Sequence, residues 1–136
     1  MTAPRRAALW VFTVAAAVVA AGVLWQAFMI VAYVRGAGPE ARDLHVSGAY
    51  VVHTLEFVVA LAAAVAFRGD WRRVCFAVLL PVYGTFQVFA IGDTDRPGGW
   101  ADGLHGLLAL VVLLQATVLA VDGARHLRGR VPATRA

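Results

Sequence analysis

The segment LHVSGAYVVHTLE, residues 44–56, opens an apolar run that continues to Phe67. A run of this length is long enough to cross a bilayer, which takes about 20 residues. His45, His53 and Glu56 lie inside it, although ionisable side chains at membrane depth are costly because they lose their hydration. At about 100° per residue, these three residues share one helix face with small residues. The pattern predicts the interior of a helical bundle that holds a bound group. The full set on this face is His45, Ala49, Val52, His53, Glu56, Ala60 and Ala63.

The composition indicates an integral membrane protein with a single domain. The chain has 136 residues, of which 61% are hydrophobic and only 15% are charged, whereas a soluble domain of this length carries more charge. All 12 basic residues are arginine, and the formal net charge is +4. The arginines flank the apolar runs, so membrane topology and anionic headgroups explain them better than a nucleic-acid partner. The single cysteine, Cys75, excludes an intramolecular disulfide and a cysteine-based zinc site.

Four membrane spans are predicted, at about 7–34, 44–67, 74–91 and 101–121, followed by a basic tail over 122–136. The first apolar run is too long for the h-region of a signal peptide, so we expect it to be retained as a span. Asp43 is a candidate N-cap for the second helix. Pro81 is expected to kink the third.

The distribution of arginine predicts the orientation. One side of the predicted bundle carries three arginines, Arg35, Arg42 and Arg96. By the positive-inside rule, the other side is cytoplasmic, and both termini lie there. The sequence therefore predicts an all-α, antiparallel four-helix bundle in the cytoplasmic membrane of a bacterium. The arginines of the cytoplasmic side are Arg5, Arg6, Arg68, Arg72, Arg73, Arg125, Arg128, Arg130 and Arg135.

Polar residues of all four spans fall in the outer half of the membrane. With a rise of about 1.5 Å per residue, His45 lies near the outer boundary, His105 roughly 6 Å below it and His53 roughly 12–13 Å below it. Gln26 and Tyr83 fall near the level of His53, and Gln87 is closer to that of His105. We expect one shared pocket between the second and fourth spans, and an inner half that is almost purely apolar.

The first hypothesis for this pocket is a single haem b, held by histidines of the second and fourth spans. His105 is the ligand expected from the fourth span. From the second span the choice is His53 or His45, and His53 is slightly preferred because it is deeper in hydrocarbon. Its offset from His105, about 6–7 Å, demands helix tilt or a slanted haem. Such a protein would pass electrons near the outer face, to or from a quinone or a redox partner protein.

The second hypothesis is a transition-metal ion. His53 and Glu56, like Asp102 and His105, are three residues apart and therefore share a helix face; His45 is a further candidate ligand. Four-helix di-iron proteins use the related spacing Glu-x-x-His, but here the second span has the order reversed.

The third hypothesis is structural. The histidines, Glu56 and the glutamines bond to one another between helices, each link contributing about 0.5–2 kcal/mol. The protein would then be an accessory subunit or a small-ligand-binding membrane protein, and a homo-oligomer is left open. Glu56 would be either a neutral partner of His53 or a proton carrier.

Short motifs carry a family resemblance. Gln26, Leu44-His45-x-x-Gly48, Gln87 and Leu104-His105 resemble an uncharacterised family of small four-span bacterial membrane proteins, in which a histidine opens the second span and another the fourth. The resemblance implies His45 and His105 as site residues and supplies no activity. The layout is also similar to cytochrome b561-like haem-binding bundles. This chain lacks the several paired histidines of two-haem members, so at most one haem is expected.

Overall fold

The computed structural model describes residues 1–90 and 100–129, except for the side chains of Ala90 and Asp102, and every regular element in this part is a helix. The order along the chain is α1 (Ala3–Val34), α2 (Pro39–Ala66), α3 (Trp71–Thr85), the π-helix η1 (Phe86–Ala90) and α4 (Trp100–Leu127).

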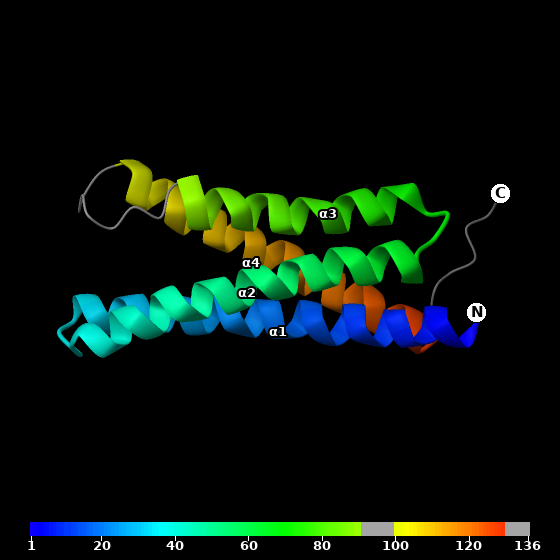
Figure 1. The fold of residues 1–136 in the computed structure, drawn as a ribbon, viewed down its shortest axis with the longest axis horizontal. Coiled ribbons are helices and arrows are strands. Elements are labelled where there is room, and N and C mark those ends of the chain that lie inside the picture. The colour runs from blue at the N-terminus through cyan, green and yellow to red at the C-terminus, as the bar shows by residue number, and fades with distance from the viewer. Residues whose placement is uncertain (91–99, 130–136) are drawn as a thin grey trace.

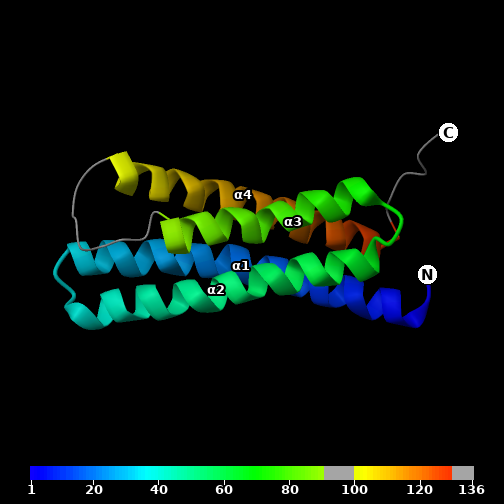
Figure 2. The same ribbon diagram turned by 45° about the horizontal axis from the view of Figure 1, so that its top comes forward.

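The helices form an antiparallel bundle, with each one running opposite to the one before it (Figures 1 and 2). α1 packs on α2 and α4, and α3 packs on the same two helices, so α2 and α4 are diagonal to each other. The start of α1, the turn at 67–70 and the end of α4 lie together at one end, here named the arginine end. The turn at 35–38, the end of η1 and the start of α4 lie at the opposite end, here named the turn end.

Three of the described helices are long and apolar enough to cross a membrane: Ala3–Val34, Pro39–Ala66 and Gly103–Leu127. α3 has only 15 residues, but it continues directly into the five residues of η1. Together they run from Trp71 to Ala90, about 30 Å at the rise of an α-helix. The predicted third span at 74–91 corresponds to this composite helix up to Ala90.

The helix boundaries follow from local chemistry. α2 begins five residues before the predicted start, because Pro39 stands at its beginning, where a missing N–H costs nothing. Its N-cap is Gly38 and not Asp43, so the N-cap prediction was wrong. Gly38 has a φ of 94°, which a residue with a Cβ rarely adopts. Asp70 caps α3, because its carboxylate accepts a hydrogen bond from the backbone N–H of Arg73 at 3.2 Å.

One apolar core runs along the bundle. Phe12 and Phe67 meet edge to face, with ring centroids 5.1 Å apart. Small residues allow the helices to approach closely; a Cβ on Gly22 would lie 2.6 Å from the Val52 side chain across the α1–α2 interface. The fully buried residues of the core come from all four α-helices and include Ala16, Val19, Val59, Ala63, Ala77, Leu80 and Ala116.

The α3 helix continues through Pro81 and changes to π-helix after Thr85. The Thr85 hydroxyl donates to the carbonyl oxygen of Pro81 at 2.7 Å. From α4, the side-chain nitrogen of Gln115 donates to the carbonyl oxygen of Phe76 at 2.5 Å. Single-turn π segments are often found at functional sites, and this one follows the two residues of α3, Gly84 and Thr85, that contact the buried polar pair described next.

Candidate functional site

An imidazole–carboxyl pair on α2 is buried within the bundle. Nδ1 of His53 lies 2.7 Å from Oε2 of Glu56, one helical turn further on. His53 is 8% exposed and Glu56 only 2%. Two such groups are stable at this depth only because each supplies the hydrogen bond that the other requires.

α3 completes this pair from the other side. Gly84 packs against the Glu56 carboxyl group, and a Cβ there would collide with it and lie 2.7 Å from Nδ1 of His53. The neighbouring Thr85 oxygen lies 3.4 Å from Nε2 of His53. Since the Thr85 hydroxyl proton already bonds to the Pro81 carbonyl, the hydroxyl oxygen accepts from Nε2–H. The contact between Nδ1 and Oε2 then holds one further proton, which makes the pair neutral overall.

Aromatic rings enclose His53. Its ring meets that of Phe57 of α2 edge to face at a centroid distance of 5.0 Å, and that of Phe89 of η1 at 6.0 Å. The two hydrogen bonds of His53 thus lie within an apolar surrounding. We name the group His53, Glu56, Gly84 and Thr85 the buried pair site.

A second pair of histidines meets near the turn end. His45 of α2 and His105 of α4 face each other across the bundle diagonal, with ring centroids 6.3 Å apart and planes inclined by 53°. Nδ1 of His45 lies 3.0 Å from the carbonyl oxygen of Gln26 on α1. In the tautomer with the proton on Nδ1, this nitrogen donates to the Gln26 carbonyl and the lone pair is on Nε2. With its amide oriented so that both of its ends are satisfied, the side-chain nitrogen of Gln26 donates to the His45 carbonyl oxygen at 2.5 Å and lies 3.0 Å from Nδ1 of His45.

The structure thus separates the residues that were expected in one shared pocket. His45, His105 and Gln26 come together; we name them the histidine pair site. His53 is eight residues from His45 on the same helix, about 12 Å along the axis, and bonds to Glu56 and Thr85. Tyr83 packs against the apolar core, and Gln87 is half-buried on η1. No hydrogen bond joins either of these two to a histidine within 1–90 and 100–129.

The candidate metal ligands form two pairs. Among the residues whose side chains are described, no three histidine, cysteine, aspartate or glutamate side chains converge as metal ligands would. Asp102 is a predicted ligand whose side chain lies outside the described residues. His45 with His105, and His53 with Glu56, are the pairs that the structure brings together.

The other half of the bundle contains polar groups that the sequence analysis overlooked. Gln115 of α4, 5% exposed, lies in the inner half of the predicted bundle, which was expected to be almost purely apolar. At the arginine end, Arg73 pairs with Asp70 through Nη1 and with Asp122 of α4 through Nε, the latter at 3.1 Å. Nδ1 of His126 lies 2.9 Å from the backbone carbonyl oxygen of Asp122. The spacing of Asp122 and His126, four residues apart on a predicted helix, is the signal that could have indicated this cluster.

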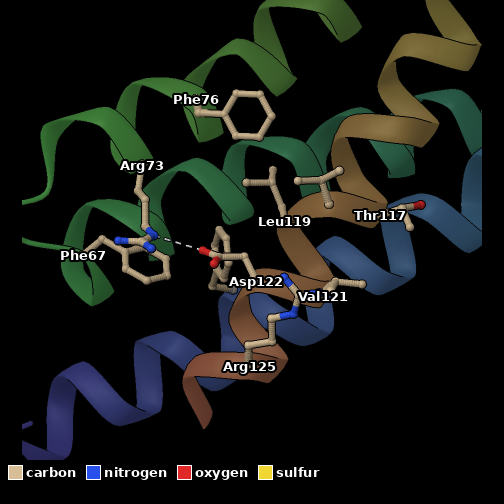
Figure 3. Close-up of a pocket in the computed structure, with 10 residues that line it drawn as sticks. Phe67, Arg73, Phe76, Thr117, Leu119, Val121, Asp122 and Arg125 are labelled. Carbon is tan, nitrogen blue, oxygen red and sulfur yellow. Dashed lines mark hydrogen bonds and ion pairs between the residues drawn. The ribbon is translucent and has the colours of Figure 1, made fainter. Parts of the chain in front are cut away.

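The charges of this cluster stabilise one another. Burial acts to lower the pKa of Arg73, but the Asp122 and Asp70 carboxylates outweigh it and raise that pKa. The Arg73 guanidinium also stacks over the Phe67 ring, 5.6 Å from its centroid. Arg73 and Asp122 line a pocket of about 390 Å³ between α3 and α4 (Figure 3).

The fold and its hydropathy define a helical-bundle protein with three candidate membrane-spanning helices. Comparisons with protein-family models, with curated proteins and with solved structures found no match. The resemblance to small four-span bacterial membrane proteins therefore stays a prediction.

Proposed function

We propose that this chain is a small b-type cytochrome-like membrane protein, which binds one haem between α2 and α4 with His45 and His105 as axial ligands. The observation that carries the proposal is the meeting of these two imidazoles across the bundle diagonal, 6.3 Å apart at their centroids. A bound haem would supply one-electron chemistry near the turn end.

The spacing of the rings fits this role. A metal ion bound by one nitrogen of each ring, at about 2 Å per bond, separates two facing ring centres by roughly 6 Å. Histidine ligands commonly donate their second ring N–H to a carbonyl, which fixes the tautomer and the ring orientation. In the Nδ1–H tautomer of His45, the Gln26 backbone carbonyl would do this and leave the lone pair of Nε2 for the iron.

His45 is a better partner for His105 than His53, the residue favoured by depth alone. Both nitrogens of His53 are engaged, by Glu56 at 2.7 Å and by Thr85 at 3.4 Å. Recruiting His53 as a ligand would leave the buried Glu56 carboxyl without its partner, which costs about 1–3 kcal/mol or more.

Haem also suits a site with two protein ligands better than a bare transition-metal ion does. A structural metal ion usually requires four protein ligands, whereas the porphyrin supplies the equatorial nitrogens of haem iron and leaves only the axial positions to the protein. Among the described side chains, the histidine pair site offers two ligands and no third one.

Four spans and cytoplasmic termini belong to the same proposal. The arginine end carries seven of the arginines in the described ranges, and the turn end carries Arg35 and Arg42. The positive-inside rule places the arginine end in the cytoplasm and the histidine pair site in the outer leaflet of the cytoplasmic membrane. The electron partner in that leaflet would be a quinone or a redox protein. The seven residues of the arginine end are Arg5, Arg6, Arg68, Arg72, Arg73, Arg125 and Arg128.

The test is the absorption spectrum of the purified protein, before and after titration with hemin. We expect a Soret band at one haem per chain, lost in His45→Ala and in His105→Ala. His53→Ala and His126→Ala are the matched controls, and both should retain the band. Thermal melting of each variant shows whether it is folded.

Two results would contradict the proposal. One is a folded protein that stays colourless with hemin; the other is a Soret band that survives His105→Ala. Elemental analysis of a colourless sample then separates a bare metal-ion site from histidines with a purely structural role, as in an accessory subunit.

A further inference from the structure

The pocket between α3 and α4 at the arginine end has an apolar wall and a charged mouth (Figure 3). Its volume is about 390 Å³. Arg73, Asp122 and Arg125 are its charged lining residues, here named the mouth. The apolar wall consists of Phe12, Phe67, Phe76, Val118, Leu119 and Val121.

This pocket opens sideways, toward the surroundings of the bundle. Phe76 of α3 is 40% exposed, and Val118 and Val121 of α4 are 46% and 44% exposed. In a chain whose α1, α2 and α4 are apolar enough to cross a membrane, exposed apolar side chains of this kind face acyl chains. The entrance is therefore accessible to a lipid from within the membrane.

The mouth has free cationic capacity. Within the described part of the chain, Nε of Arg73 bonds to Asp122 and Nη1 bonds to Asp70. Nη2 is therefore available to an added acceptor such as a phosphate oxygen. Arg125 is exposed and adds a second guanidinium. The seven described arginines of this end outnumber its two aspartates, Asp70 and Asp122, so its net charge is strongly positive.

We propose that this pocket binds one anionic phospholipid of the surrounding membrane. The lipid phosphate is held by Arg125 and by Nη2 of Arg73, because guanidinium groups match phosphate oxygens in geometry and charge. One acyl chain lies along Phe76 and Val118 in the apolar part of the pocket. Basic pockets between membrane helices on the cytoplasmic side are suited to such headgroups. This proposal is independent of the haem site, which lies at the other end of the bundle.

The charge pattern favours an anionic over a zwitterionic headgroup. A choline group would bring a positive charge to the arginine end, which already carries an excess of arginine. Asp122 is engaged with Arg73 at 3.1 Å and lies 3.5 Å from His126, so it is not an open acceptor for that charge. Dioleoylphosphatidylglycerol should therefore be retained in preference to dioleoylphosphatidylcholine.

The experiment is native mass spectrometry of the delipidated full chain in detergent, after addition of each of these two lipids at equal concentration. We expect one phosphatidylglycerol per chain, retained several-fold more than phosphatidylcholine. Arg125→Gln should reduce retention of phosphatidylglycerol about fivefold, the effect of one basic residue near an anionic lipid. Arg128→Gln, three residues further on, just beyond the end of α4 and outside the pocket lining, is the matched control and should change little.

A second variant tests the acyl chain. Val118→Trp narrows the apolar part of the pocket at an exposed position and should reduce retention of both lipids. The proposal fails if Arg125→Gln retains phosphatidylglycerol as well as the wild type, or if both lipids are retained equally. It also fails if millimolar glycerol 3-phosphate displaces the lipid, because the acyl chain would then contribute nothing.

Discussion

Gly84 of α3 packs directly against the carboxyl group of Glu56 on α2, at a point where any larger residue would collide with it. This contact positions the Glu56 carboxyl 2.7 Å from Nδ1 of His53. A glycine inside a helix costs about 1 kcal/mol relative to alanine. At position 84 the close packing of α2 and α3 outweighs this difference in helix propensity.

Gly84→Ala should therefore destabilise the bundle despite its better helix propensity. The new Cβ would lie 2.7 Å from Nδ1 of His53 and closer still to the Glu56 carboxyl. Overpacking of this kind typically costs about 1–3 kcal/mol. The measurement is the thermal midpoint, or the free energy of unfolding, in detergent.

Gly103→Ala is the control, since a Cβ on this α4 glycine meets nothing within 4 Å. We expect it to be neutral or slightly stabilising. Equal effects of the two substitutions would show that the contact between Gly84 and Glu56 is unimportant.

Replacing Glu56 should be tolerated only where the replacement can donate to His53. If Nε2–H bonds to Thr85, Nδ1 requires a donor, which the amide of Glu56→Gln supplies. Glu56→Leu leaves Nδ1 buried and unpaired, and this should cost about 1–3 kcal/mol more than Glu56→Gln. Free energies of unfolding of both variants provide the comparison.

A double-mutant cycle makes this prediction specific. In a His53→Leu background no buried nitrogen remains to be satisfied, so the difference between Gln and Leu at position 56 should disappear or reverse. If Glu56→Leu proves as stable as Glu56→Gln with His53 intact, the proposed sharing of hydrogen bonds is wrong.

The helical architecture could be predicted because the hydropathy pattern and the residues that start and stop helices are properties of the local sequence. The apolar runs predicted helices ending near Val34 and Phe67, and the structure ends α1 at Val34 and α2 at Ala66. The predicted start of α2 was five residues too late. Asp43 has a high capping propensity, but Pro39, with its fixed φ, is suited to the first position of a helix and begins α2.

The candidate site could be predicted only in part. Helical periodicity gives the face of a residue and the helical rise gives its level, but neither states which neighbour a side chain meets. His45 and His53 share a face of α2, yet one turns to His105 on the diagonal helix and the other to Thr85 on an adjacent helix. Gln115 was overlooked although a single polar residue within an apolar span is visible in the sequence.

Stability should depend on pH through Asp70. The backbone N–H of Arg73, and then its side chain, hold the pKa of Asp70 below its usual range. A carboxyl whose pKa is lowered on folding stabilises the native state above its unfolded pKa, about 4, and this contribution is lost as the pH falls through the folded value. The difference in thermal midpoint between the wild type and Asp70→Ala should therefore be largest near pH 7 and shrink toward pH 3.

At neutral pH the loss of the α3 N-cap in Asp70→Ala should amount to about 1 kcal/mol. Asp43→Ala is a suitable comparison, because Asp43 is exposed on α2 and is not its N-cap. It should change stability by less than about 0.5 kcal/mol. A pH-independent difference between the wild type and Asp70→Ala would argue against the charged cap.

Arg5 should stabilise the arginine end by closing the C-terminus of α2. The last carbonyls of a helix lack intrahelical partners, and the Arg5 guanidinium donates to the carbonyl oxygen of Ala66 at 3.1 Å and to that of Arg68 at 3.3 Å. Arg5→Gln should therefore destabilise the chain by about 1 kcal/mol and speed amide hydrogen exchange in the turn at 67–70. Arg6→Gln removes the same charge from an exposed neighbour and should do neither. If both variants behave alike, the effect comes from net charge, and the hydrogen bonds of Arg5 contribute nothing measurable.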